Sequence, residues 1–178
     1  MLERRFGFPV TISNDVVCSM LAERFFGHGD KSMLFIKIDR GIGAATLIDD
    51  VTVIGQNHAG GEIGHISLDP ESGVLCPCGK RGCLETMVTS PVIRERIRRA
   101  STPEEQLDII RSCGEQLAAA LAMPIGLLDI NDICVYGPPD IVNAAFLEAT
   151  QRRVDMVSSS KFHKHTSCLL YTSPSPRA

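Results

Sequence analysis

"GEIGHISLDPESGVLCPCGKRGCLE", residues 61–85, places one histidine and three cysteines within a single short segment. Ten residues separate the histidine from the first cysteine, one residue separates the first two cysteines, and four separate the last two. The candidate ligands are His65, Cys76, Cys78 and Cys83. Three thiolates and one imidazole are a complete tetrahedral set for zinc and leave no position open for a catalytic water. The segment therefore predicts a structural zinc site rather than a hydrolytic one.

Two alternatives to a metal site fit these cysteines less well. A chance cluster of reduced core cysteines is at odds with the Gly, Pro and Lys residues beside them. A disulfide would leave one of the three thiols unpaired, and a cysteine cluster in a cytosolic chain favours metal binding. Gly79 and Gly82 also permit the tight backbone turns that wrap a segment around an ion. A zinc site accounts for all of these residues.

Two carboxylates flank the predicted ligands. Glu62 precedes His65 by three residues, and Glu85 follows Cys83 by two. An ion that holds both ligands would bring both carboxylates near a common point. Carboxylates beside an imidazole edge suit the adjacent hydroxyls of a polyol, which need acceptors in fixed positions. For Glu85 the alternative is a solvated acid at the start of a helix.

The composition describes an ordinary soluble globular protein. The chain has 178 residues, of which 44% are hydrophobic and 22% charged, with a net charge of −3. This acidic balance argues against a broad basic face for nucleic acid. The apolar stretches are too short or too interrupted to span a bilayer, and no signal peptide opens the chain. We expect a cytoplasmic protein without a membrane partner.

Apolar runs and helical periodicity alternate along the chain. Strands are expected over 8–12, 32–38 and 132–137, and helices over 16–27, 90–100, 102–121 and 138–154. Both the 90–100 and the 102–121 segments begin with Ser or Thr before Pro, which is typical of a helix start. Pro124 should kink or end the second of these helices. The alternation predicts an α/β fold.

The pairing of "GGEIGH" with "CPCGKRGCLE" resembles the ROK family, which comprises sugar kinases and sugar-responsive transcriptional repressors. The resemblance runs from about Phe8 to about Arg153. It implies an actin-like ATPase (ribonuclease H-like) α/β domain, present in part, with an inserted structural zinc loop over 62–85. On this basis residues 1–157 would be a partial sugar-binding domain, and the protein a homo-oligomer.

The same resemblance assigns roles to individual residues. It makes the histidine and three cysteines the zinc ligands, and it matches "ISNDV" to the family's Asn-Asp pair. In a kinase, Asp15 would also be the catalytic base, because a carboxylate can accept the proton of an attacking hydroxyl. From the residues alone, Asn14 and Asp15 would equally suit a helix N-terminus. The implied sugar contacts are Asn14, Asp15, Asn57, Glu62, His65 and Glu85.

Two motifs depart from the kinases of this family. Their Gly-Thr-Gly turn, which approaches ATP phosphates, is replaced by "IDRGIGA", in which Asp39 would repel a phosphate and Arg40 could partly compensate. Their glycine run beside the nucleotide is replaced by "VYGPPDIV", in which Pro138 and Pro139 supply no N–H groups. The sequence therefore favours the sugar-sensing effector domain of a ROK-type regulator, binding a hexose or amino sugar. The alternatives are a ROK sugar kinase of the glucokinase or N-acetylglucosamine kinase type, using ATP and Mg²⁺, and a zinc-stabilised interaction domain without a sugar site.

The two ends of the chain carry further expectations. Neither an Asp-x-Gly-Gly-Thr stretch nor a helix-turn-helix, which in the family precede "FPVTISND", has a match here. We therefore expect a fragment that would contact DNA only through a region outside this chain. Residues 158–178 are expected to form an unstructured tail. Within it, 168–178 resembles the translated read-through of a sequencing adapter and is expected to be non-native.

Overall fold

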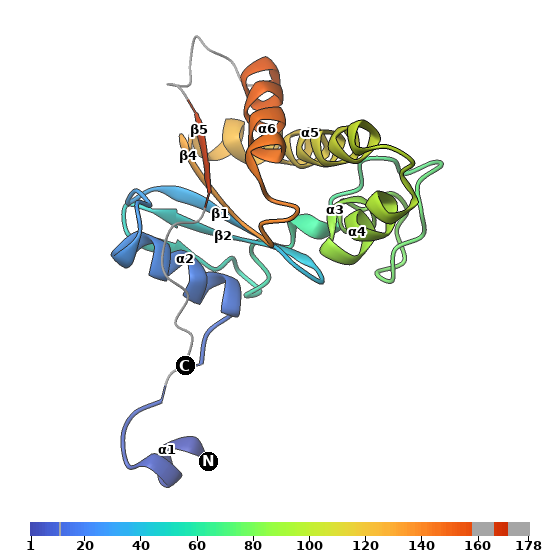
Figure 1. The fold of residues 1–178 in the computed structure, drawn as a ribbon. Coiled ribbons are helices and arrows are strands. Elements are labelled where there is room, and N and C mark those ends of the chain that lie inside the picture. The colour runs from blue at the N-terminus through green and yellow to red at the C-terminus, as the bar shows by residue number, and fades with distance from the viewer. Residues whose placement is uncertain (11, 158–165, 171–178) are drawn as a thin grey trace.

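The computed structural model describes residues 1–10, 12–157 and 166–170. Within them, five strands form one sheet in the order β3-β2-β1-β4-β5 (Figure 1). Strand β1 runs antiparallel to β2 and parallel to β4, β3 is antiparallel to β2, and β5 is parallel to β4. The strands are β1 Met33–Ile38, β2 Ile42–Ile48, β3 Val51–Val53, β4 Asp132–Tyr136 and β5 Ser167–Leu170. An antiparallel trio extended by two parallel strands is the mixed α/β sheet expected of the ribonuclease H-like class.

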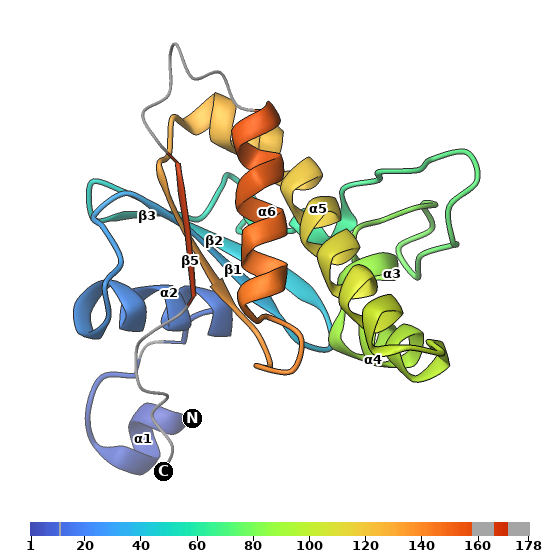
Figure 2. The same cartoon turned by 45° about the horizontal axis from the view of Figure 1, so that its top comes forward.

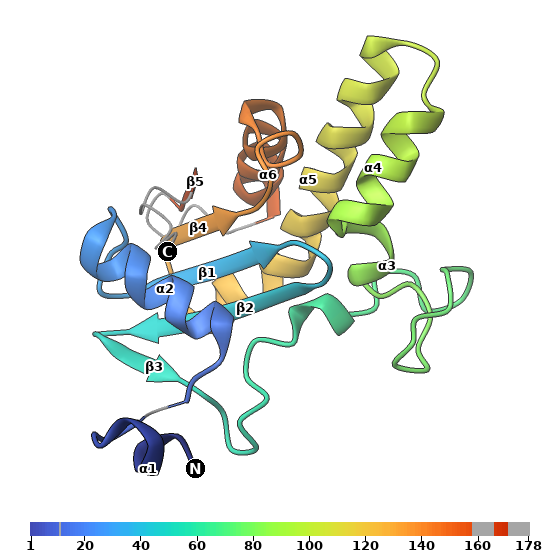
Figure 3. The same ribbon diagram turned by 60° about the horizontal axis from the view of Figure 1, so that its bottom comes forward.

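Helices cover both faces of this sheet. Helix α2 lies on one face, and α5 and α6 lie side by side on the other (Figures 1 and 2). Figure 3, in which the bottom of the molecule is turned forward, shows α2 in front of β1 and β2. The helices are α1 Leu2–Phe6, α2 Asp15–Phe26, α3 Glu85–Val88, α4 Ser90–Arg99, α5 Pro103–Leu128 and α6 Ala144–Val157, with a 3₁₀ turn at Ile63–His65. None of the helices in the described ranges is long and apolar enough to cross a lipid bilayer.

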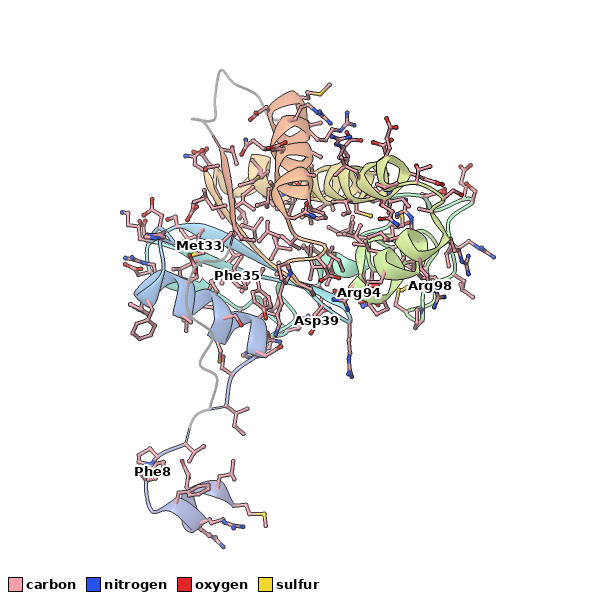
Figure 4. The ribbon with its side chains drawn as sticks, viewed as in Figure 1. Phe8, Met33, Phe35, Asp39, Arg94 and Arg98 are labelled. Carbon is pink, nitrogen blue, oxygen red and sulfur yellow. The ribbon has the colours of Figure 1, made fainter. Side chains whose placement is uncertain are left out.

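Alternation along β1 divides the core into two clusters. Ile36 and Ile38 belong to the larger cluster, which α5 and α6 close with residues such as Leu117 and Phe146. Met33 and Phe35 point to the opposite face and pack under α2, as Figure 4 shows. Since side chains of a strand alternate between faces, one strand supplies both halves of the core.

Helix α5 differs from the sequence-based expectation at its C-terminal end. The sequence predicts a kink or an end at Pro124; the helix does not end there but continues to Leu128. Proline lacks the N–H of the helical ladder and costs about 3 kcal/mol in a helix interior. Leu121 and Ile125, on either side of Pro124, are fully buried in the core. Their burial offsets the missing hydrogen bond and holds the last turn on the sheet.

The predicted strand over 8–12 is not found in the described residues of that segment. Residues 8–10 and 12 have no strand structure, and Phe8 and Ile12 are 59% and 84% exposed. Figure 4 shows Phe8 on the N-terminal segment, well away from the sheet. A β-rich composition favours a strand only where a neighbouring strand offers hydrogen bonds, and in the described residues none lies beside this segment.

The expectation of an unstructured tail is corrected for one short segment. Ser167–Leu170 pairs in parallel with β4 as the edge strand β5, and the Ser167 N–H donates to the Asn131 carbonyl at 2.7 Å. An exposed strand edge offers unpaired backbone groups that a short apolar segment can satisfy whatever its periodicity. Residues 158–165 and 171–178 lie outside the described residues. The expectation that 168–178 is non-native stays a prediction.

Candidate functional site

The histidine and three cysteines predicted as ligands come together in space. One ligand atom from each of His65, Cys76, Cys78 and Cys83 lies within 4.8 Å of all the others. The Cys78 and Cys83 sulfurs are 3.6 Å apart, and the Cys76 sulfur lies 3.6 Å from His65 Nδ1. Tetrahedral zinc bonds would separate two sulfurs by about 3.8 Å, and a sulfur from a nitrogen by about 3.5 Å. The four side chains could therefore hold one tetrahedral metal ion.

Backbone hydrogen bonds fold the segment into a compact loop around this cluster. The Gly79 N–H donates to the Cys76 carbonyl at 2.9 Å, and the Cys76 N–H donates to the Lys80 carbonyl at 2.8 Å. Gly82 has φ +64°, and a Cβ there would lie 2.1 Å from the Asp69 carbonyl oxygen. Only glycine fits this position, as expected for a turn that carries ligands.

The thiols of the cluster differ in their surroundings. Cys83 is fully buried, and burial raises the pKa of its thiol to about 11. Cys78 is exposed, and a hydrogen bond from the Lys80 backbone N–H lowers the pKa of its thiol. Because a metal binds the thiolate, an ion that occupied this site would displace the proton of Cys83. Occupancy should therefore fall in acid.

A second feature, a cavity of about 300 Å³, opens at the N-terminus of α2. This volume lies at the lower end of the range for small-molecule sites. Its walls come from the start of α2, the turn between β1 and β2, the loop before the 3₁₀ turn and the start of α3. The charged and amide side chains in its lining are Asn14, Asp15, Lys37, Asp39, Arg40, Glu62 and Glu85.

The loop that carries Glu62 packs directly against the sheet. The Ala44 N–H in β2 donates to the Gly61 carbonyl at 2.8 Å. Gly61 has φ +95°, and a Cβ there would lie 1.9 Å from the Ala44 carbonyl oxygen. The absent side chain lets the loop approach the strand closely, and Glu62 thereby lines the same cavity as Glu85. The two carboxylates converge, as their positions on either side of the ligands predict.

At the mouth of the cavity, α2 is capped by Asn14, the residue that precedes it. Asn14 Oδ1 accepts hydrogen bonds from the Val16 and Val17 N–H groups at 2.8 and 3.4 Å. The capping role considered for Asn14 is therefore present, and its amide nitrogen is left to act as a donor. Asp15 is the first helical residue; it lines the cavity, and its side chain is 73% exposed.

Asp15 is paired with a strand residue that sequence reasoning missed. Lys37 Nζ donates to Asp15 Oδ2 at 2.6 Å, and this hydrogen bond lowers the pKa of the Asp15 carboxyl. The available signal was a single lysine within the otherwise apolar "MLFIKI" of β1. Two other predicted sugar contacts, Asn57 and His65, do not line the cavity. Asn57 is exposed, and His65 belongs to the metal cluster.

Comparison with known proteins identifies the family. Residues 1–158 match the ROK family. The chain belongs to the ROK family. The actin-like fold of that family agrees with the mixed sheet and its two helical faces.

ROK relatives of this chain include both regulators and kinases. A putative xylose repressor of Caldicellulosiruptor sp. is 32% identical over 164 residues, which are 80% of this chain and 41% of the repressor. A glucokinase of Halalkalibacterium halodurans is 41% identical over 91 residues, which are 50% of this chain and 28% of the glucokinase. The crystal structure of a ROK family transcriptional regulator, a homologue of the E. coli MLC protein, superposes with a TM-score of 0.83 at 25% identity. The superposition covers 95% of this chain and 49% of that regulator. The chain thus spans less than half the length of each of these proteins.

The two segments expected to differ from the ROK kinases, 38–44 and 135–142, lie at one end of the sheet. The Asp39 carbonyl in the β1–β2 turn accepts a hydrogen bond from the Ser90 N–H at 2.8 Å. Arg94 of α4 forms a two-pronged ion pair with Asp140, at 2.8 and 3.0 Å. Figure 4 shows Asp39 and Arg94 near each other at this end. The turn, α4 and the 138–142 loop are thereby tied together.

Proposed function

We propose that this chain is part of the sugar-sensing effector domain of a ROK-type transcriptional regulator. It would bind a hexose or amino sugar in the cavity at the N-terminus of α2. The proposal rests on one contrast. The carboxylates of what we call the sugar side, Asp15, Glu62 and Glu85, line one cavity. The segments of what we call the phosphate side, 38–44 and 135–142, are unsuited to bind phosphate.

The sugar side offers a set of acceptors and one donor. Asp15, Glu62 and Glu85 contribute carboxylate oxygens, and the Asn14 amide nitrogen contributes a donor. A pyranose presents adjacent hydroxyls that need such acceptors at fixed positions. We propose zinc as the ion of the neighbouring cluster, with His65 and the three cysteines as ligands. That ion would fix the segment between Glu62 and Glu85, and so the distance between their carboxylates.

The phosphate side offers few free backbone donors. The N–H groups of Ile141 and Val142 both donate to the Pro138 carbonyl, at 2.9 and 2.8 Å. The two prolines before them supply no N–H at all. In the other departing segment, the Asp39 N–H donates to the Gly41 carbonyl at 2.9 Å, and the Asp39 carboxylate lines the cavity. A nucleotide phosphate would meet a negative charge and few unpaired donors.

Signal transfer would require a sugar that binds two states of the regulator unequally. Closure of the 62–85 segment over the sugar would favour one state and change the affinity of a DNA-binding region outside this chain. A homo-oligomer would let two such regions act on one operator. These steps are part of the proposal, and we infer them because the relatives of this chain include repressors.

Isothermal titration of the zinc-loaded chain with D-glucose, N-acetyl-D-glucosamine and Mg²⁺–ATP tests the proposal. We expect a sugar to bind, Mg²⁺–ATP not to bind, and sugar binding to be lost in Asp15→Asn and Glu62→Gln. Glu115→Gln is the matched control, because Glu115 pairs with Arg152 on the exposed helical surface, outside the cavity lining.

A ROK sugar kinase is the second candidate. The observation that favours it is the 41% identity to a glucokinase over half of the chain, together with Asp15 at the cavity. Binding of Mg²⁺–ATP at micromolar concentration would support this kinase over the regulator. Binding of neither sugar nor nucleotide would favour a metal-stabilised interaction domain without a sugar site.

A further inference from the structure

Lys37 of β1 forms an ion pair with Asp15 of α2 but belongs to none of the sequence motifs of the proposed sugar site. We propose that Lys37 is a positioning residue: it fixes the Asp15 carboxylate as an ionised acceptor for a sugar hydroxyl and disfavours its use as a proton-abstracting base. This inference rests on the proposed function and states how the site would recognise its ligand.

The sheet delivers Lys37 to this place by strand alternation. Met33, Phe35 and Lys37 share the face of β1 that α2 covers, and the first two are fully buried there. Lys37 comes last in this row, where α2 begins and the cavity opens. Its side chain is 22% exposed, so most of its length packs against neighbours while the ammonium group reaches the cavity.

The neighbouring strand leaves room for this side chain. The residue opposite Lys37 in β2 is Gly43, and a Cβ there would lie 3.1 Å from Val16 Cγ2 of α2. A larger residue at this position would press against the first turn of α2. With glycine in place, the lysine reaches Asp15 at 2.6 Å.

The contact constrains the chemistry of Asp15. Lys37 occupies Oδ2, so Oδ1 is the oxygen left to accept a hydrogen bond from a ligand. The ammonium group keeps the carboxyl ionised to lower pH, so that it remains a hydrogen-bond acceptor there, and it lowers the basicity of the carboxylate. Asp15 is 73% exposed, so a ligand can reach it without displacing the lysine. Binding that needs an acceptor is favoured, and proton transfer to Asp15 is disfavoured.

The other charges around the cavity act on Asp15 in both directions. Among the described residues of the lining, Arg40 is the one cation that accompanies Lys37, whereas three further carboxylates face the same space. The carboxylates raise the proton affinity of Asp15, and the cations lower it. The titratable and charged groups that line the cavity with Asp15 are Lys37 from β1, Asp39 and Arg40 from the β1–β2 turn, Glu62 from the loop and Glu85 from α3. Direct contact makes Lys37 the dominant influence.

Two readouts on the zinc-loaded full chain test the role of Lys37. The first is the Asp15 side-chain carbon, followed by ¹³C NMR through an acid titration without ligand. We expect Lys37→Met to raise the pH at which Asp15 titrates, and Lys37→Arg to restore it. The second is the affinity for D-glucose and N-acetyl-D-glucosamine from pH 3 to pH 8, a range that extends below the ordinary pKa of an aspartate, about 3.9. At neutral pH Asp15 is ionised with or without Lys37, so the loss of affinity in Lys37→Met reports lost positioning of the carboxylate and should be about tenfold, equivalent to about 1.4 kcal/mol.

The pH profile separates positioning from mere structural support. Binding needs ionised Asp15, so affinity is present above the pKa of Asp15 and falls as the pH drops through it. In Lys37→Met this fall should begin at higher pH. Lys31→Met is the matched control, because Lys31 pairs with Asp49 on the surface, away from the cavity. Its profile should equal that of the unaltered chain, including any loss of metal in acid.

The outcomes are distinct. If the unaltered chain binds a sugar but Lys37→Met matches Lys31→Met in affinity, pH profile and Asp15 titration, the role of Lys37 is overturned and the sugar site stands. If neither sugar binds the unaltered chain, the proposed function is overturned and this inference with it. Sugar binding with a shifted Lys37→Met profile and rescue by Lys37→Arg supports both.

Discussion

The close contact between the Glu62 loop and β2 can be tested by Gly61→Ala. A Cβ at Gly61 would lie 1.9 Å from the Ala44 carbonyl oxygen, whereas ordinary contact begins at 3.4 Å. The loop would therefore have to move by about 1.5 Å, the difference between these two distances. Such a movement would break the hydrogen bond from the Ala44 N–H to the Gly61 carbonyl. It would also displace Glu62 from the cavity.

Two terms set the size of the effect on the free energy of unfolding. A non-glycine residue at positive φ costs about 1–2 kcal/mol, and a buried donor without a partner costs about 1–3 kcal/mol. We therefore expect Gly61→Ala to lower the free energy of unfolding by about 2–5 kcal/mol. The measurement is equilibrium unfolding in urea of the zinc-loaded chain, with the m-value checked for a two-state transition.

Two control substitutions to alanine separate the cost of a positive φ from the cost of a steric clash at the added Cβ. Gly55 begins the same loop at φ +73°, and a Cβ there would meet its nearest neighbour at 3.4 Å, an ordinary contact. Gly55→Ala should therefore show the strain term alone, about 1–2 kcal/mol. Gly126 lies inside α5 with nothing within 4 Å, so Gly126→Ala should stabilise by up to about 1 kcal/mol. A loss in Gly61→Ala no larger than in Gly55→Ala would refute the reasoning.

Three further predictions concern the metal cluster, the core and a helix start. Cys83→Ser should leave less than one zinc per chain by elemental analysis, because three ligands bind more weakly than four, while the exposed Cys18→Ser should retain it. Phe146→Ala removes a fully buried ring and should cost about 3–5 kcal/mol in urea unfolding; a cost below about 1 kcal/mol would contradict the packing. Thr102→Ala removes the cap of α5 and should cost about 1 kcal/mol, seen as a lower Tm.

The elements set by local sequence were predicted well. The strand over 32–38 appears as β1, and the helices with Ser-Pro and Thr-Pro starts appear as α4 and α5. The Thr102 hydroxyl accepts a hydrogen bond from the Glu105 N–H at 3.1 Å, as such a start requires. These features depend on residues a few positions apart, so the sequence contains most of the information that fixes them.

The elements decided by distant partners were predicted less well. Pro124 lies within a helix because Leu121 and Ile125 are buried on the core, a contact that no local pattern reveals. The predicted strand over 8–12 is absent because no neighbouring strand lies beside it among the described residues. Ser167–Leu170 is a strand because β4 offers its free edge. In each case tertiary pairing or packing outweighed local propensity.

For the candidate site, the sequence alone predicted that one histidine and three cysteines cluster and that two carboxylates line one cavity. The spacing of these four residues within one segment is a local property of the sequence, which is why the cluster could be predicted. Only the tertiary structure decided that Lys37 reaches Asp15, and that Glu62 approaches through the contact between Gly61 and Ala44. These contacts join strand, helix and loop across the fold. Their geometry follows from sheet register and close packing, which act between residues far apart in the chain.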